Sequence, residues 1–156
     1  MKQLLILSGK GGTGKTTLAS AFIKIAKAKA YCDCDVDAPN LHLSLNELHK
    51  PKEFDFFGMP KAKIDNEKCV KCGLCQKYCK FDAIRFFEGY SIDYHACEGC
   101  GVCEYVCKFG AIRLYPDIAG INKLYNKKEV FSTAELKMGS GNSGKLVSRV
   151  KEILKD

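Results

Sequence analysis

The chain has 156 residues, 46% of them hydrophobic, and a formal net charge of +7. This length allows one ordinary domain or two small ones, and the apolar content is ordinary for a soluble globular protein. No stretch approaches the roughly 20 apolar residues of a membrane helix, and no signal peptide is recognisable. We therefore expect a cytoplasmic protein whose ten cysteines are not a secreted disulfide framework.

The first segment predicts a nucleotide site. Residues 3–8 are typical of a short buried strand, and residues 17–29 are typical of a helix. Between them the pattern G-x-x-x-x-G-K-S/T of a phosphate loop is complete. In such a loop Lys15 reaches the β- and γ-phosphates, the Thr16 hydroxyl binds Mg²⁺, and the following helix directs its dipole at the phosphates. The predicted nucleotide contacts are Gly9, Lys10, Gly11, Gly12, Thr13, Gly14, Lys15, Thr16 and Thr17. The predicted apolar helix face consists of Leu18, Phe22, Ile25 and Ala26.

The additional lysine of this loop, Lys10, carries a resemblance. The run from Lys10 to Thr16 resembles the deviant phosphate loop of the MinD/ParA/Mrp and nitrogenase iron-protein ATPases. That resemblance implies Mg-ATP rather than GTP, and a homodimer in which Lys10 reaches the nucleotide of the partner subunit. The alternative is that Lys10 is only a solvated loop charge.

Residues 30–40 resemble the second strand and first switch of the same ATPases, where an Asp-x-Asp pair lies at the end of the strand. Asp35, and after it Asp33, match that pair and are expected to hold Mg²⁺ or to orient the attacking water. A solvated turn is the alternative. For Cys32 and Cys34 we favour the role of small buried residues, with metal binding or redox sensing as the alternatives.

Residues 41–63 are expected to be a connection, and beyond them lies an internal repeat. Residues 64–85 and 92–113 are identical at 12 of 22 positions with an offset of 28. Each half carries the spacing Cys-x-x-Cys-x-x-Cys-x-x-x-Cys, and Glu88-Gly89 between the halves predicts a hairpin turn. The two runs are Cys69, Cys72, Cys75, Cys79 and Cys97, Cys100, Cys103, Cys107.

This repeat resembles the bacterial two-cluster ferredoxins, except that Lys80 and Lys108 replace the usual proline after each fourth cysteine. Because the fourth cysteine of each run ligates the other cluster in those proteins, we expect two 4Fe–4S clusters. One is held by Cys69, Cys72, Cys75 and Cys107, and the other by Cys97, Cys100, Cys103 and Cys79. Zinc is the alternative, but this spacing fits a zinc site poorly. Two clusters of charge about −2 each lower the net charge to about +3, which argues against a nucleic-acid partner and leaves a redox protein as the expected partner.

Residues 143–155 predict an amphipathic helix with Leu146, Val147, Val150, Ile153 and Leu154 on one stripe. The chain as a whole resembles a MinD-superfamily ATPase with an inserted ferredoxin. We therefore predict an α/β fold: an incomplete, parallel-sheet P-loop domain at 1–63 and 115–156, with an α+β two-cluster ferredoxin domain at 64–114. No later strand ending in Asp and no second switch is recognisable, so the sequence has the character of an N-terminal portion.

Three functions follow from this reading. The first is an ATPase that couples hydrolysis to electron transfer or metallocluster assembly, with Lys10, Lys15 and Asp35 as catalytic residues. The second is a non-enzymatic electron carrier whose P-loop half binds nucleotide or docks a partner. The third is a scaffold that delivers iron–sulfur clusters. The expected partner of the ATPase is a second copy of this chain or a chain that supplies the missing half.

Overall fold

A computed structural model describes residues 3–9, 12–45 and 49–154. The chain divides into two compact units, one formed by residues 1–54, 121–136 and 143–156 and the other by residues 55–120 and 137–142. The predicted insert at 64–114 lies inside the second unit. That unit also contains the segments on both sides of residues 64–114 and a six-residue piece near the C-terminus.

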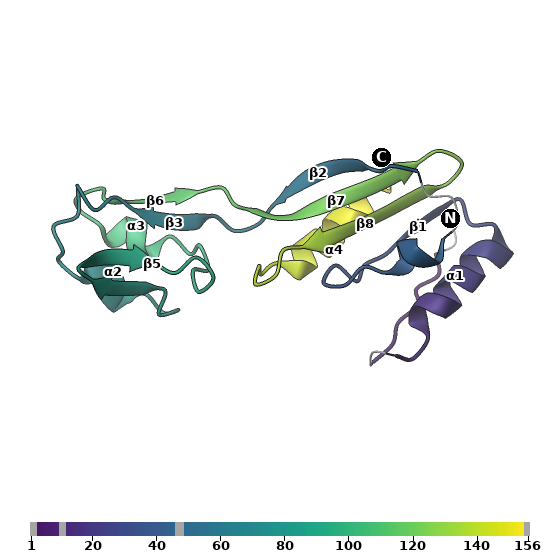
Figure 1. Ribbon diagram of the computed structural model, residues 1–156, viewed down its shortest axis with the longest axis horizontal. Helices are drawn as coiled ribbons and strands as arrows, with labels where there is room; N and C mark the ends of the chain where they lie inside the picture. The colour runs from purple at the N-terminus through teal and green to yellow at the C-terminus, as the bar shows by residue number, and fades with distance from the viewer. Residues whose placement is uncertain (1–2, 10–11, 46–48, 155–156) are drawn as a thin grey trace. The chain divides into compact units, whose positions relative to one another are not determined.

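The first unit contains most of a four-stranded sheet with the order β1-β8-β7-β2 (Figure 1). β1 pairs with β8 in parallel, with Ala30 opposite Val130. β7 and β8 are neighbours joined by only three residues, so they run antiparallel, because a parallel pair needs a much longer crossover. The expected purely parallel sheet is therefore wrong, and the sheet is mixed. The strands are β1 (Ala30–Cys32), β2 (Lys52–Phe57), β7 (Ile118–Asn126) and β8 (Val130–Leu136).

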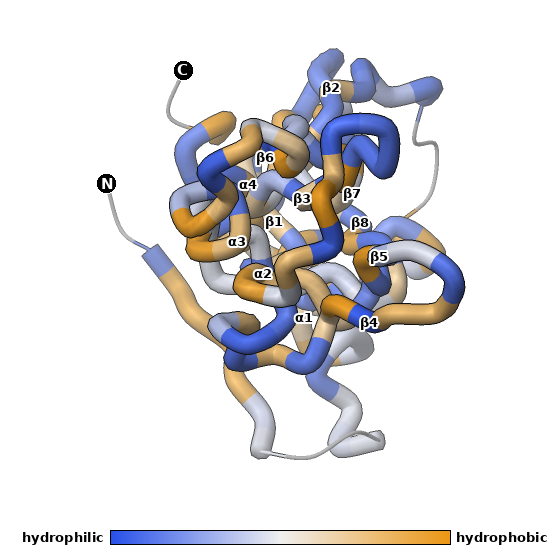
Figure 2. Tube along the Cα trace, turned by 90° about the vertical axis from the view of Figure 1, so that its left-hand side faces the viewer, coloured by the Kyte–Doolittle hydropathy of each residue, from blue (hydrophilic) through white to orange (hydrophobic). Residues whose placement is uncertain are grey.

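The predicted strand at residues 3–8 is also wrong, since residues 3–7 have no regular structure. Leu4, Leu5 and Leu7 are 67%, 71% and 79% exposed, and the segment is hydrophobic in Figure 2. A run of leucines becomes a buried strand only where neighbouring strands accept its backbone groups. Among the described residues, no strand of the sheet pairs with this segment.

The predicted helix after the glycine-rich loop is present as α1 (Lys15–Ala26), beginning two residues earlier and ending three residues earlier than expected. Its predicted apolar face is not buried: Leu18, Phe22 and Ile25 are all exposed, and Ser20 is the buried residue. The face that the sequence marks as apolar therefore has no covering layer in the described part of the chain. A short 3-10 helix, η1 (Leu41–Ser44), packs against α1.

The core of the first unit lies between the sheet and α4 (Ser143–Glu152). Leu146 and Val150 of α4 are completely buried, which confirms the amphipathic helix, but α4 ends at Glu152 and leaves the predicted stripe residues Ile153 and Leu154 in the turn that follows. Phe131 of β8 is 1% exposed and stacks on Tyr31 and Tyr125, with ring centroids 5.2 Å and 5.3 Å apart.

Within residues 61–115 of the second unit, both strand pairs join one half of the repeat to the other. β3 is antiparallel to β6, and β4 is antiparallel to β5. Two backbone hydrogen bonds just beyond these ladders occupy equivalent positions in the two halves of the repeat. Asp65 N donates to Ala111 O, and Asp93 N donates to Ala83 O, both at 2.7 Å. The elements are β3 (Lys61–Ile64), α2 (Leu74–Tyr78), β4 (Ile84–Phe87), β5 (Gly89–Ile92), α3 (Val102–Val106) and β6 (Ile112–Tyr115).

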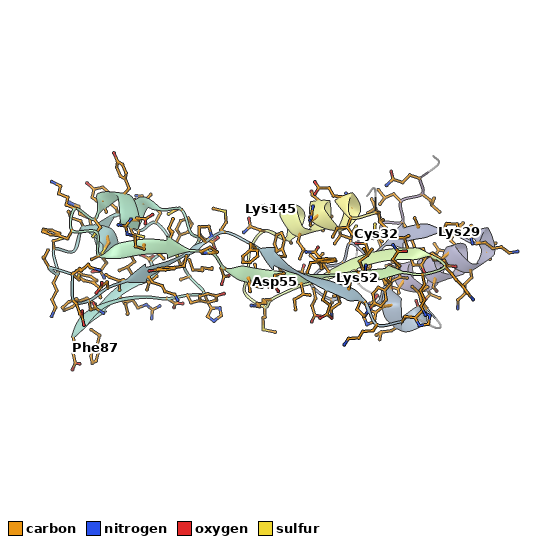
Figure 3. The ribbon with its side chains drawn as sticks, turned by 90° about the horizontal axis from the view of Figure 1, so that it is seen from above. Lys29, Cys32, Lys52, Asp55, Phe87 and Lys145 are labelled. Atoms are coloured by element: carbon orange, nitrogen blue, oxygen red, sulfur yellow. The ribbon has the colours of Figure 1, made fainter. Side chains whose placement is uncertain are left out.

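The turn predicted at Glu88-Gly89 is confirmed, with Glu88 in the left-handed conformation at φ 58° between β4 and β5. Phe87 lies at the tip of this hairpin and is 83% exposed (Figure 3).

The backbone conformation repeats between the two halves, as the sequence does. Lys71 and Gly99 have φ of 57° and 66°, and Asp82 and Gly110 have φ of 50° and 62°.

The core of the second unit is formed jointly by apolar side chains and cysteines. Ile112, Ala83 and Ile84 are at most 4% exposed. Cys75 and Cys97 are each 7% exposed and belong to the same core cluster. Because thiols occupy the centre of so small a unit, its interior depends on what those thiols bind.

Candidate metal centre and glycine-rich loop

The two short helices of the second unit present equivalent cysteines. Gly73 and Gly101, with φ of 78° and 80°, precede α2 and α3. The left-handed conformation is inexpensive for glycine and turns the chain sharply into each helix. Cys75 and Cys103 are consequently the second residues of α2 and α3, and the two helices pack against each other.

A pocket in the second unit is lined by four cysteines from both halves of the repeat. Cys79 comes from the first half, and Cys97, Cys100 and Cys103 come from the second. These four are the set that the sequence assigns to one cluster. The pocket contains about 360 Å³ of empty space, open solvent included. The rest of its lining is mainly apolar and includes Ala62, Phe81, Ala83, Ile84, Ile92 and Leu114.

The other predicted set is related to the first by the repeat. Burial raises the pKa of the Cys75 thiol, and the neighbouring Cys69 and Cys72 raise it further when they are charged. Those three side chains are therefore close enough to interact. Cys107, the expected fourth member, packs against the same core cluster as Cys69.

The buried thiols resist ionisation in the protein alone. Burial raises the pKa of Cys103 to about 11, and the charges of Cys97 and Cys100 add to the effect. A thiolate is the form that ligates iron, so binding must displace these protons. Cationic iron compensates the negative charge of the thiolates. A group of buried cysteines is therefore more stable with a bound metal than as free thiolates.

The chemistry of these donors fits iron–sulfur clusters. Eight thiols in two related sets, one of them around a common pocket, match the four-cysteine requirement of each 4Fe–4S cluster. Among residues 3–9, 12–45 and 49–154, no three His, Cys, Asp or Glu side chains converge as a group that could hold a single metal ion.

One supporting residue was not predicted from the sequence. Lys61 of β3 donates a hydrogen bond to the carbonyl oxygen of Cys97 at 2.5 Å, and its ammonium group lies 5.0 Å from the centre of the Tyr94 ring. It therefore fixes the backbone at the first cysteine of the second run. Nothing in the sequence near Lys61 indicates this contact, because it spans 36 residues.

In the first unit, the end of the glycine-rich loop meets the Asp-x-Asp segment. The Lys15 ammonium group lies 3.3 Å from a carboxylate oxygen of Asp35, and both side chains are about one third exposed. The Thr16 hydroxyl donates to the side-chain oxygen of Asn40 at 2.7 Å. The structure thus brings together Lys15, Thr16 and Asp35 and adds Asn40, which the sequence did not indicate. Lys10 and Gly11 lie outside the described residues.

Asp33 is engaged differently from Asp35. It is 9% exposed, and its carboxylate accepts backbone N–H bonds from Asp35 at 3.0 Å, Asn40 at 3.2 Å and Leu41 at 3.0 Å. These bonds use both carboxylate oxygens and shape the loop that carries Asp35. Asp33 is therefore a positioning residue in this structure, while the carboxylate of Asp35 faces Lys15.

Cys32 and Cys34 lie beside this loop, and their sulfur atoms are 3.7 Å apart. Both side chains are partly buried. The hydrogen bond between the two thiols lowers the pKa of Cys34 to about 7 and raises the pKa of Cys32 well above its ordinary value. The prediction that both are simply buried small residues therefore omits the contact between them.

Comparison with known proteins identifies one part of the chain. A family model described as a 4Fe–4S dicluster domain matches residues 62–114. The uncharacterised protein MJ0578 of Methanocaldococcus jannaschii is 36% identical over 89 residues, which are 55% of this chain and 32% of that protein. The shared segment is longer than the dicluster match, so the similarity extends beyond it. The chain thus matches about a third of the length of this relative.

The structure contains no helix, among the residues it describes, that is long and apolar enough to cross a bilayer.

The matched segment contains all eight cysteines of the repeat and lies within the second unit. Residues 62–114 are therefore a 4Fe–4S dicluster domain of the ferredoxin type.

Proposed function

We propose that this protein carries electrons through two 4Fe–4S clusters and couples that transfer to ATP bound at the glycine-rich loop. The observation that carries the electron-transfer part is the pocket lined by Cys79, Cys97, Cys100 and Cys103, because cysteines from both halves of a repeat contribute to it. Crossed ligation of this kind is the arrangement of two-cluster ferredoxins.

In this proposal Cys97, Cys100, Cys103 and Cys79 hold one cluster. By the same rule Cys69, Cys72, Cys75 and Cys107 hold the other. When bound, each cluster supplies a site for one-electron reduction and oxidation. The chain contributes the thiolate ligands, and apolar side chains such as Ile84, Ile92 and Leu114 exclude water from the pocket.

The test of the cluster assignment is iron analysis of protein that has been purified or reconstituted without oxygen. We expect about eight iron atoms per chain, falling by about half in Cys75→Ser. Cys34→Ser is the matched control, because Cys34 lies outside the repeat, and it should retain all the iron. Unchanged iron in Cys75→Ser would disprove the ligand set. Equal iron loss in the control would show that the loss does not report ligation.

The nucleotide part of the proposal is supported by the contacts of Lys15 and Thr16. Asp35 holds the Lys15 ammonium group where the loop meets α1, and Asn40 holds the Thr16 hydroxyl. Binding of Mg-ATP would exchange these contacts for phosphate oxygens and Mg²⁺, with Asp35 free to bind the metal ion or to orient water. The resemblance to MinD-type ATPases favours ATP and a dimer in which Lys10 acts across the interface.

Turnover of ATP by the fully clustered protein, beside Lys15→Ala, tests this second part. Hydrolysis that is lost in Lys15→Ala supports a redox-linked ATPase. Nucleotide binding without hydrolysis, with both clusters intact, would reduce the function to an electron carrier with a nucleotide-binding docking unit. Transfer of iron and sulfide from the protein to an apo-ferredoxin would instead favour the scaffold function.

A further inference from the structure

Two cysteines outside the dicluster domain are in contact at the end of a parallel strand. Cys32 is the last residue of β1 and is paired with Ser132 of β8. The pairing continues one residue further, since Asp33 N donates to Ser132 O at 3.0 Å. Side chains two residues apart along an extended chain share one face, which places the sulfur atom of Cys34 3.7 Å from that of Cys32.

We propose that Cys32 and Cys34 form a redox-active dithiol that closes to a disulfide, separately from the iron–sulfur clusters. The oxidant is a small-molecule disulfide. One cysteine sulfur attacks it, forming a mixed disulfide and releasing one thiol. The second cysteine loses its proton and attacks the first cysteine sulfur, releasing the second thiol. The two protein thiols lose two protons and two electrons, and the oxidant is reduced to two thiols.

The fold permits a disulfide ring between Cys32 and Cys34, but the ring would be strained. Two residues apart in an extended chain, the Cα atoms are separated by about 6.6 Å, near the upper end of the range found in disulfides. Closure requires the sulfur atoms to approach from 3.7 Å to about 2.05 Å. A strained disulfide is reduced more easily than a structural one, so the pair is suited to reversible oxidation.

A metal site is the competing use of two adjacent thiols. Protein zinc sites use three or four protein ligands. Within the described residues no third His, Cys, Asp or Glu side chain joins Cys32 and Cys34 in a group that could hold an ion. The pair therefore has the composition of a dithiol rather than of a metal centre.

Oxidation would affect Asp33, the residue that a disulfide between Cys32 and Cys34 would enclose. Asp33 lies between the two cysteines, and its carboxylate accepts the backbone N–H groups of Asp35 and Leu41. Closing the ring shortens the chain across Asp33 and must change the direction of that carboxylate. Oxidation is therefore expected to loosen the loop that carries Asp35.

The test is thiol trapping on the intact, clustered protein over a series of reduced-to-oxidised glutathione ratios. After acid quenching and alkylation, trypsin cuts after Lys29 and Lys52 (both labelled in Figure 3), because Lys50 is followed by proline. The resulting peptide contains Cys32 and Cys34 and no other cysteine. We expect it doubly alkylated under reducing conditions. Under oxidising conditions we expect it unalkylated and about 2 Da lighter than the free dithiol peptide, the mass of two hydrogen atoms.

Single variants and the unfolded chain provide the controls. Cys32→Ser and Cys34→Ser should stop at the glutathione mixed disulfide. Ring closure in the folded protein should be about tenfold faster than in urea, because the fold holds the sulfur atoms together. A peptide that stays doubly alkylated throughout, or that carries two glutathiones, would overturn the proposal. So would equal closure rates, or protection from alkylation that a chelator removes.

Discussion

A single methyl group at Gly99 should damage the second cysteine run far more than the same group at Gly110. Both glycines have left-handed φ, 66° and 62°. A Cβ at Gly99 would overlap the carbonyl oxygen of Pro60, and it would lie 3.1 Å from the carbonyl carbon of Pro60 and 3.2 Å from Cβ of Met59. A Cβ at Gly110 has no atom within 4 Å. The two positions therefore share backbone strain but differ in steric overlap.

The expected magnitudes follow from these two terms. Alanine in the left-handed region costs about 1–2 kcal/mol, which is the whole expected effect of Gly110→Ala. In Gly99→Ala the overlap is with main-chain atoms, which cannot rotate away, so the backbone must shift at a further cost of about 1–3 kcal/mol. The shift would occur between Cys97 and Cys100, where two thiols must keep their positions around the pocket.

The assay is the rate at which each variant loses its visible cluster absorbance to an iron chelator, together with its unfolding in denaturant without oxygen. We expect Gly99→Ala to lose one cluster much faster than Gly110→Ala. Equal rates and equal stabilities in the two variants would refute the reasoning. The repeat offers an internal check, because Lys71 takes the equivalent left-handed conformation with a side chain. Backbone conformation alone therefore does not exclude a Cβ at this place in the motif.

Four further outcomes are expected. Asp33→Ala removes the carboxylate that accepts hydrogen bonds from three backbone N–H groups of its loop. Because each buried group left unpaired costs about 1–3 kcal/mol, the free energy of unfolding should fall by about 3 kcal/mol in denaturant titration. Lys15→Ala breaks an ion pair that is about one third exposed, so its unfolding free energy should change by less than about 1 kcal/mol even if nucleotide binding, measured by calorimetry, is abolished. Thr133→Val should be neutral or stabilising by about 1 kcal/mol in thermal unfolding, because the Thr133 hydroxyl is buried and has no hydrogen-bond partner among the described residues. Alkylation of Cys34 by iodoacetamide should rise through about pH 7, because the hydrogen bond with Cys32 lowers the pKa of Cys34 and the thiolate is the reactive form; an unshifted profile in Cys32→Ala would contradict that cause.

The dicluster domain could be predicted from sequence because its information is local and repeated. The spacing of eight cysteines, the duplicated segments and the turn at Glu88 each require only neighbouring residues. The contact of Lys61 with Cys97 could not be predicted in this way, because it depends on how β3 lies beside the second cysteine run.

The first unit was predicted less completely, for identifiable physical reasons. The residues after 121 contain many polar side chains, yet β7 and β8 form there, because valine, phenylalanine and threonine at 130, 131 and 133 favour an extended chain. The leucines at 4, 5 and 7 predicted a strand from hydrophobicity alone. Hydrophobicity indicates a preference for burial but not the presence of a neighbour. Asp33 carries the same carboxylate as Asp35, and only the structure distinguishes the loop-shaping residue from the one that faces Lys15.

The pairing of strands across the repeat has a consequence for its ancestry. In the described part of the chain β3 pairs with β6 alone and β4 with β5 alone, so neither half of the dicluster domain has a sheet of its own. A half-length peptide could complete both ladders only by associating with a second copy, and that copy would also supply the crossing cysteine. Duplication and fusion of the gene for such a dimeric peptide would preserve every backbone bond between the halves. It would also free the two copies to acquire different surfaces, as the lysine at 71 and the glycine at the equivalent position 99 illustrate.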